Sequence, residues 1–177
     1  MISIRKISTK DTFFFDYNTK LLLSSFPKEE RREIEEWREL TDLNHLFTNN
    51  IILKNNMPIG MITYWELRDI IFIEHFAIDS QLRNGGLGKQ SINLLLKQSK
   101  KPIILEVDLP EDAIAKRRVE FYKRQGLLLW DKKYKQPPYR SSDNSVPMRL
   151  MSTIQTPTEE SFEHFKEAIY QYVYAKK

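Results

Sequence analysis

The chain has 177 residues, which is enough to bury one sizeable core and too few for most multi-domain enzymes. Its 28 Lys+Arg against 24 Asp+Glu give a formal net charge of +4, without the dense basic stripe that nucleic-acid-binding proteins usually carry. The sequence contains no cysteine, which excludes disulfides, thiolate metal sites and cysteine nucleophiles.

The N-terminal half predicts one strand, two helices and three more strands. Residues 2–7 alternate isoleucines with polar residues and stop at a helix-start signal, so we expect a strand and then a helix over about 11–24. Pro27 opens a charged segment whose apolar residues recur at helical spacing. From residue 49 the period becomes that of extended chain, and short polar breaks predict an antiparallel meander of three strands.

The C-terminal half alternates a glycine-rich turn, a helix, a buried strand, a second helix and two further strands. A meander that runs into a β-α-β unit predicts an α/β fold with a mixed sheet flanked by helices. We expect residues 1–152 to form this domain. Residues 153–177 predict an extra C-terminal helix with one aromatic face, packed on the same domain or on a partner in a homodimer.

A glycine-rich segment, LRNGGLGK at residues 82–89, lies between a predicted strand and a predicted helix. Glycine lets the backbone turn tightly and approach a ligand closely, while the free N–H groups of a helix start attract anions. Arg83 and Lys89 flank the glycines with positive charge. The segment therefore predicts a site for phosphate or pyrophosphate.

Two common phosphate motifs do not fit this segment. A P-loop needs glycine where Arg83 stands and a hydroxyl residue where Gln90 stands. A dinucleotide fingerprint needs a different glycine spacing after the first strand of a parallel unit. The pattern that remains is R-x-x-G-x-G, and a plain turn before a helix stays open as the alternative.

The R-x-x-G-x-G formed by Arg83, Gly86 and Gly88 resembles the pyrophosphate loop, Q/R-x-x-G-x-G/A, of the GNAT superfamily of acetyl-CoA-dependent N-acetyltransferases. A second resemblance follows downstream, where Tyr122 is followed four residues on by Gly126 and then by an apolar residue, as in the late helix of that family. The resemblance implies a mixed central sheet that is splayed at its middle.

The same resemblance implies the chemistry. Acetyl-CoA would be the co-substrate, and a primary amine on a small molecule or peptide would attack its thioester directly, so no cysteine is needed. Tyr122 would protonate the departing CoA sulfur. Main-chain groups of the strand before the loop would hold the pantetheine arm and stabilise the oxyanion. The expected cofactor-binding residues are Phe76, Ala77, Ile78, Arg83, Asn84, Gly85, Gly86, Leu87, Gly88 and Lys89.

Glu74 is the predicted general base. By period-two alternation it shares a face with Phe72 and Phe76 and lies opposite His75, and a carboxylate on an apolar strand should have a raised pKa. An edge carboxylate or an ion-pair partner stays open, and a β-bulge would change where Glu74 points. Further candidates near the same strand ends are Glu66, Glu106 and Asp108.

The acceptor is expected to enter between the N-terminal helices and a polar loop around residues 134–143. Two other classes remain open: a CoA-binding regulatory module without catalysis, and a basic nucleic-acid-binding domain. The histidines show no ligand-like spacing, so we expect no metal. No segment approaches the roughly 20 apolar residues of a membrane span and no secretory signal is present, so we expect a cytoplasmic protein with no membrane or nucleic-acid partner.

Overall fold

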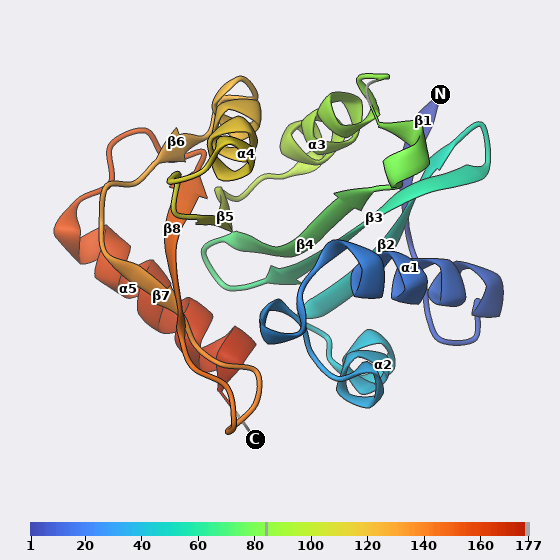
Figure 1. The fold of residues 1–177 in the computed structure, drawn as a ribbon, viewed down its shortest axis with the longest axis horizontal. Coiled ribbons are helices and arrows are strands. Elements are labelled where there is room, and N and C mark those ends of the chain that lie inside the picture. Colours follow the sequence, from blue (N-terminus) through green and yellow to red (C-terminus); the bar gives the residue numbers. More distant parts are fainter. Residues whose placement is uncertain (84, 176–177) are drawn as a thin grey trace.

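The computed structural model describes residues 1–83 and 85–175, which form a layered α/β structure (Figure 1). The strands are β1 (Ile2–Lys6), β2 (Phe47–Lys54), β3 (Met57–Glu66), β4 (Ile71–Ile78), β5 (Ile103–Asp108), β6 (Leu128–Leu129), β7 (Tyr134–Gln136) and β8 (Val146–Ser152). The helices are α1 (Thr12–Ser25), α2 (Ile34–Leu43), α3 (Leu87–Gln98), α4 (Ala113–Lys123) and α5 (Glu159–Ile169). No helix in this part of the chain is long and apolar enough to cross a membrane.

All of these strands belong to one sheet, in the order β1-β2-β3-β4-β5-β8-β6, with β7 also paired to β8. Two buried clusters fill its two sides. One contains apolar residues of α1, α2 and α5, and the other contains those of α3 and α4. The helices are therefore divided between the two faces, as Figure 1 shows.

The predicted meander is confirmed, because β2, β3 and β4 pair antiparallel in chain order. Asn55 and Asn56 have φ angles of 51° and 66°, a conformation that asparagine tolerates better than most residues and that a tight hairpin needs.

The charged segment after Pro27 forms a short 3-10 turn, Lys28–Glu30, before α2 begins at Ile34.

The sheet opens at its middle. β4 and β5 run parallel, but they pair only at Ile71–Ile73 and Ile103–Leu105. Glu74 and Glu106 are the first residues beyond the last pair, so both carboxylates lie where the strands begin to separate. The mixed, splayed sheet with helices on both faces and an extra C-terminal helix is confirmed.

β4 carries a bulge at Glu74, which has no partner in β3 although the residues on either side of it do. Two consecutive residues at a bulge can point to the same side. Glu74 contacts residues of the α1/α2/α5 side, and His75 packs there against Phe26. Phe76 packs on the opposite side. The expectation that Glu74 shares a face with Phe76 and lies opposite His75 is therefore wrong.

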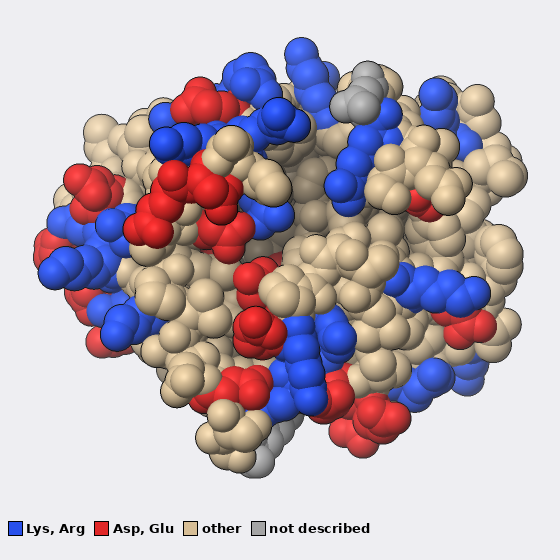
Figure 2. Space-filling view, in the orientation of Figure 1, with Lys and Arg blue, Asp and Glu red and all other residues tan. Residues whose placement is uncertain are grey.

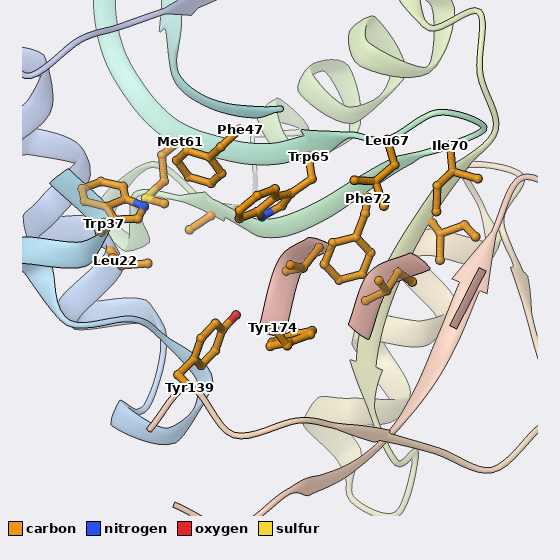
Figure 3. Packing of buried hydrophobic residues seen from close by; sticks show 14 of the residues in the cluster. Leu22, Trp37, Phe47, Met61, Trp65, Leu67, Ile70, Phe72, Tyr139 and Tyr174 are labelled. Carbon is orange, nitrogen blue, oxygen red and sulfur yellow. The ribbon is translucent and has the colours of Figure 1, made fainter. Parts of the chain in front are cut away.

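The C-terminal helix packs into the main core. α5 continues into a π-helical turn, Tyr170–Tyr174, and Phe162, Ile169 and Val173 lie in the same buried cluster as Phe72 of β4. Figure 3 shows Tyr174 next to Tyr139, below Trp65 of β3. The C-terminal residues thus reach the sheet close to its opening.

Residues 134–143 differ from the polar loop expected there. Tyr134 begins β7 and is buried, and Tyr139 is also buried in the main core. β7 exists because it pairs with β8, which follows it in the chain. This long-range pairing turns an apparently polar segment into part of the sheet.

Candidate active site

A pocket of about 400 Å³ lies between β4, the start of α3 and α4. Most of the predicted cofactor-binding residues line it: Phe76, Ile78, Arg83, Gly86, Leu87, Gly88 and Lys89. Phe121 of α4 and Arg124 and Gln125 of the turn that follows it also line the pocket, although no motif in the sequence marks them. Ala77 is buried in the core on the other face, and Gly85 does not line the pocket. Asn84 lies outside the described residues.

The pocket suits a phosphate-bearing ligand because a helix begins at its edge. Gly86 precedes α3 with a φ of 69°, a conformation that L side chains rarely adopt. The first N–H groups of α3 and its positive dipole end face this edge, where Arg83, Lys89 and Arg124 add positive charge. Figure 2 shows a hollow in this face of the molecule with basic side chains above it.

Gly88 leaves room within the pocket. A Cβ atom there would stand 3.6 Å from Ile78 and 3.7 Å from Phe121, which is ordinary van der Waals contact. A side chain at position 88 would therefore cause no clash with the protein. It would, however, fill the space between Ile78 and Phe121. Glycine at position 88 thus keeps this part of the pocket open.

Tyr122 lies on α4 and is buried against the sheet. Burial raises the pKa of its hydroxyl to about 12, and the nearby charge of Arg118 only partly opposes this. Tyr122 thus keeps its proton at neutral pH and has a donor to offer.

Glu74 is fully enclosed, with 0% of its side chain exposed, and it is hydrogen-bonded on both oxygens. Its Oε1 accepts from Arg32 Nε at 3.1 Å and from the Tyr139 hydroxyl at 2.9 Å, and its Oε2 accepts from Trp65 Nε1 at 3.0 Å. Burial alone would raise the pKa of Glu74, but Arg32, His75 and these donors outweigh burial and lower it. The expected raised pKa is therefore wrong, because a buried arginine pairs with the carboxylate.

Glu106, on the neighbouring strand β5, has the opposite environment. The hydroxyls of Tyr134 and Tyr174 donate to its two oxygens, the latter at 2.7 Å, and the residue keeps some solvent exposure. Burial raises its pKa, the two tyrosines lower it, and the charges of Glu74 and Glu30 raise it again, to about 7. Glu106 can therefore change protonation state near neutral pH.

A third carboxylate, Glu30, lies near enough to Glu106 for its charge to raise the pKa of Glu106. Burial and the charge of Asp108 raise the pKa of Glu30 to about 7, although Arg118 opposes this shift. Arg118 pairs with Asp108 at 2.6 Å. His75 Nε2 lies 3.0 Å from the Glu30 carbonyl oxygen and so ties this short turn to β4. Figure 2 shows acidic side chains to the left of the hollow and below it.

Hydrogen bonds span the entry that we expect for the acceptor. Arg140 donates to the carbonyls of Lys28 and Arg31 at 2.7 and 3.1 Å, and Gln136 Nε2 donates to the carbonyl of Glu29 at 3.2 Å. The segment after β7 is thereby joined to the segment between α1 and α2. These hydrogen bonds therefore bridge the space between the two segments.

A family model described as the acetyltransferase (GNAT) family matches residues 7–127. The chain belongs to the GNAT family. A GNAT-family protein from Bacteroides thetaiotaomicron, whose structure is solved, is 42% identical over 99% of both chains, with a TM-score of 0.95. The search of curated proteins returned no match.

More distant GNAT-like structures show the same fold. Arabidopsis thaliana NAA60, solved with acetyl-CoA, is 14% identical, with a TM-score of 0.64 over 86% of this chain and 97% of its own. An aminoglycoside 6'-N-acetyltransferase, solved with coenzyme A, is 16% identical, with a TM-score of 0.62 over 88% and 99% of the two chains. At these identities the likeness concerns the fold alone.

Proposed function

We propose that this GNAT protein transfers an acetyl group from acetyl-CoA to a primary amine by direct attack within a ternary complex. The supporting observation is a basic pocket at the start of α3 that borders the opening between β4 and β5, where Glu106 has a pKa near 7. Structures of the same fold solved with acetyl-CoA or CoA add support.

In this proposal the pocket residues hold the co-substrate. The N–H groups at the start of α3, with Arg83, Lys89 and Arg124, would bind the pyrophosphate. Beyond residue 73 β5 no longer pairs with β4, so the edge of β4 at Phe76 and Ile78 faces the opening. Main-chain groups of that edge would pair with pantetheine and donate an N–H to the thioester oxygen as it gains negative charge.

We assign the general base to Glu106 in place of Glu74. Arg32 holds Glu74 ionised, and three donors already occupy its oxygens. Glu106 is ionised in about half of the molecules near pH 7, which is where a general base works best. Its carboxylate would take one proton from the substrate ammonium, leaving a neutral amine whose lone pair attacks the thioester carbon.

Tyr122 would carry out the second proton transfer of the reaction. As the carbon–sulfur bond breaks, Tyr122 would give its proton to the sulfur, and the attacking nitrogen would return a proton to the tyrosine oxygen. The products are the acetylated amine and CoA thiol. The proton on Glu106 then leaves for solvent, so each turnover releases one proton.

The acceptor is proposed to be a cationic amine, on a small molecule or a peptide. Glu30 and Glu106 are each ionised in about half of the molecules near pH 7, and Asp108 is paired with Arg118, so the opening carries partial negative charge. Such a charge favours an ammonium group over an anionic one. A homodimer and a cytoplasmic location stay predictions.

The test combines acetyl-CoA binding with thiol release. Thermal-shift titration should show stabilisation by acetyl-CoA, and a free-thiol assay over monoamines, polyamines, aminoglycosides and short peptides should find an acceptor. Glu106→Gln should lower kcat/KM by roughly 10²- to 10⁴-fold without loss of acetyl-CoA binding. Tyr122→Phe should lower turnover far more than CoA affinity. Glu66→Gln, a surface carboxylate paired with Lys101, is the matched control.

Each alternative has its own outcome in this test. Absence of stabilisation by acetyl-CoA would contradict the proposal, and salt-sensitive DNA or RNA binding in its place would favour a nucleic-acid-binding domain. Stabilisation without thiol release for any amine would favour the regulatory module. Full activity of Glu106→Gln would remove Glu106 from the mechanism.

A further inference from the structure

The C-terminal segment brings a side chain to the reacting end of the sheet. Tyr174 lies in the π-helical turn that follows α5, and its hydroxyl donates to Glu106 Oε2 at 2.7 Å. The match to the family model ends at residue 127, so Tyr174 lies outside the matched region. π-Helical turns are rare and often occur at functional sites.

We propose, on the basis of the function proposed above, that Tyr174 is a positioning residue for acetyl transfer, which holds the carboxylate of Glu106 in the orientation that takes the proton of the amine. Tyr174 itself need not touch the substrate. It would act by fixing the group that does.

The contacts of Glu106 support this role. Tyr134 of β7 and Tyr174 donate to different oxygens of the same carboxylate, so together they fix its rotation. A carboxylate oxygen accepts more than one hydrogen bond, and each therefore keeps a lone pair for an ammonium group or a bridging water. Without Tyr174 one oxygen would lose its donor and the carboxylate could turn.

Tyr174 is itself held firmly. It is buried, and its ring packs against that of Tyr139 with centroids 5.2 Å apart. The preceding carbonyl, of Val173, accepts a hydrogen bond from Arg32, which also pairs with Glu74. Figure 3 shows the Tyr139 and Tyr174 rings side by side. The segment therefore connects the environments of both carboxylates at the opening of the sheet.

The groups that face Glu106 determine the sign of the expected pH effect. Glu74 of β4 and Glu30 of the 3-10 turn raise the pKa of Glu106, while the hydroxyls of Tyr134 and Tyr174 lower it. The charge of Glu106 in turn raises the pKa values of Tyr139 and Tyr170, so these two phenols also lie near it. Loss of the Tyr174 hydroxyl removes a donor to the ionised form, so the pKa of Glu106 rises further.

The first experiment is the pH profile of kcat/KM for Tyr174→Phe. Its acid limb should move upward by about 1 to 2 pH units, the size expected for one hydrogen bond to a charged group, with acetyl-CoA affinity unchanged. Tyr134→Phe should move it in the same direction. Tyr170→Phe is the matched control, because Tyr170 belongs to the same turn but donates to the carbonyl of Lys135.

A second variant reverses the sign and avoids a loss of folding. Replacement of Tyr174 by 3,5-difluorotyrosine keeps the ring and makes the hydroxyl a stronger donor, so the acid limb should move to lower pH. Opposite shifts for the two variants would be difficult to obtain from a merely structural effect. The positioning role would be overturned if the acid limb stayed unchanged in both Tyr174 variants. It would also be overturned if Tyr170→Phe shifted the acid limb as much as Tyr174→Phe does.

The outcomes also separate this inference from the proposed function. No turnover of any amine by the wild-type protein would contradict both. An acid limb that persists in Glu106→Gln would show that another group is the base, and Tyr174 would then have no base to position. In a third case, Glu106→Gln removes the acid limb of the pH profile, but neither Tyr174 variant shifts it. This result would overturn the role of Tyr174 alone.

Discussion

At the scale of single residues, two carboxylates occupy equivalent positions on adjacent strands and yet differ in proton affinity. Glu74 and Glu106 both follow the last β4–β5 pair, and both accept hydrogen bonds on each carboxylate oxygen. Arg32 lies beside Glu74, whereas the donors to Glu106 in the described part of the chain are the neutral phenols of Tyr134 and Tyr174. A cation in contact with one of them is enough to separate the two pKa values in the way that acid–base chemistry requires.

We expect Arg32→Met to destabilise the protein strongly. The substitution would leave Glu74 as a buried carboxylate without a counter-charge and would also remove the bond to the Val173 carbonyl. Loss of one partner of a buried ion pair typically costs about 3–5 kcal/mol in the free energy of unfolding. Urea denaturation at pH 7 measures this loss.

The control for this prediction is Arg68→Met, because 95% of the Arg68 side chain is exposed. Adding Glu74→Gln to Arg32→Met should restore part of the lost free energy, since the unpaired charge is then gone. An Arg32→Met variant as stable as the Arg68→Met control would show that the pair contributes little.

The sequence places both carboxylates among the candidates, Glu74 because it interrupts an apolar strand and Glu106 because it lies near the end of the next one. It could not show which one titrates near neutral pH. Arg32 is 42 residues from Glu74 and Tyr174 is 68 residues from Glu106, so both contacts depend on the tertiary fold. The bulge at Glu74 likewise appears only when the register with β3 is known.

At the scale of elements, two glycines at the start of α3 have different structural roles. Gly86 supplies a positive φ, whereas Gly88 stands inside the helix and leaves space in the pocket. The sequence predicts the loop well, because glycines followed by a helical apolar pattern are a local signal.

The two glycines should respond differently to alanine. Gly86→Ala should lower the unfolding free energy by about 1–2 kcal/mol through its strained φ. Gly88→Ala should keep or raise stability, by up to about 1 kcal/mol, while its methyl group weakens acetyl-CoA binding. Thermal denaturation with and without acetyl-CoA measures both effects. Unaltered acetyl-CoA stabilisation of Gly88→Ala would mean that the ligand does not lie between Ile78 and Phe121.

Other elements could not be predicted from local pattern. β7 forms only through its pairing with β8, and the segment around it looks polar because Tyr134 and Tyr139 are separated by lysine, glutamine and prolines. The apolar face of the C-terminal helix predicts the burial of Phe162 and Ile169 correctly, but Tyr172 at its end is 49% exposed. Nothing in that face indicates that a tyrosine in the turn after α5, Tyr174, would donate a hydrogen bond to Glu106.

At the scale of the whole molecule, the two carboxylates with raised pKa values affect stability. Glu30 and Glu106 have an ordinary pKa of 4.5 and a pKa of about 7 in the folded protein. Between these values the folded state binds more protons than the unfolded state, so their contribution to stability falls as pH rises through about 7. Paired surface acids such as Asp42 and Asp143 act in the opposite direction at low pH.

Glu106→Gln should therefore stabilise the protein in a pH-dependent way. Relative to the wild type, the variant should gain more unfolding free energy at pH 8.5 than at pH 5, by at most about 3 kcal/mol, because the charge that is costly to bury is absent. Chemical denaturation at both pH values tests this, with Glu66→Gln as the control. A difference that does not vary with pH would mean that Glu106 titrates normally.

The distance along the chain between the two halves of the site has a consequence for its biosynthesis. The pocket proposed for acetyl-CoA draws on residues 76–125, while the second donor to Glu106 is Tyr174. A protein is made from its N-terminus, so all pocket residues leave the ribosome before Tyr174 does. A chain still under synthesis would thus be able to acquire its acetyl donor before its base is held in place, and transfer would begin only once the final turn has docked.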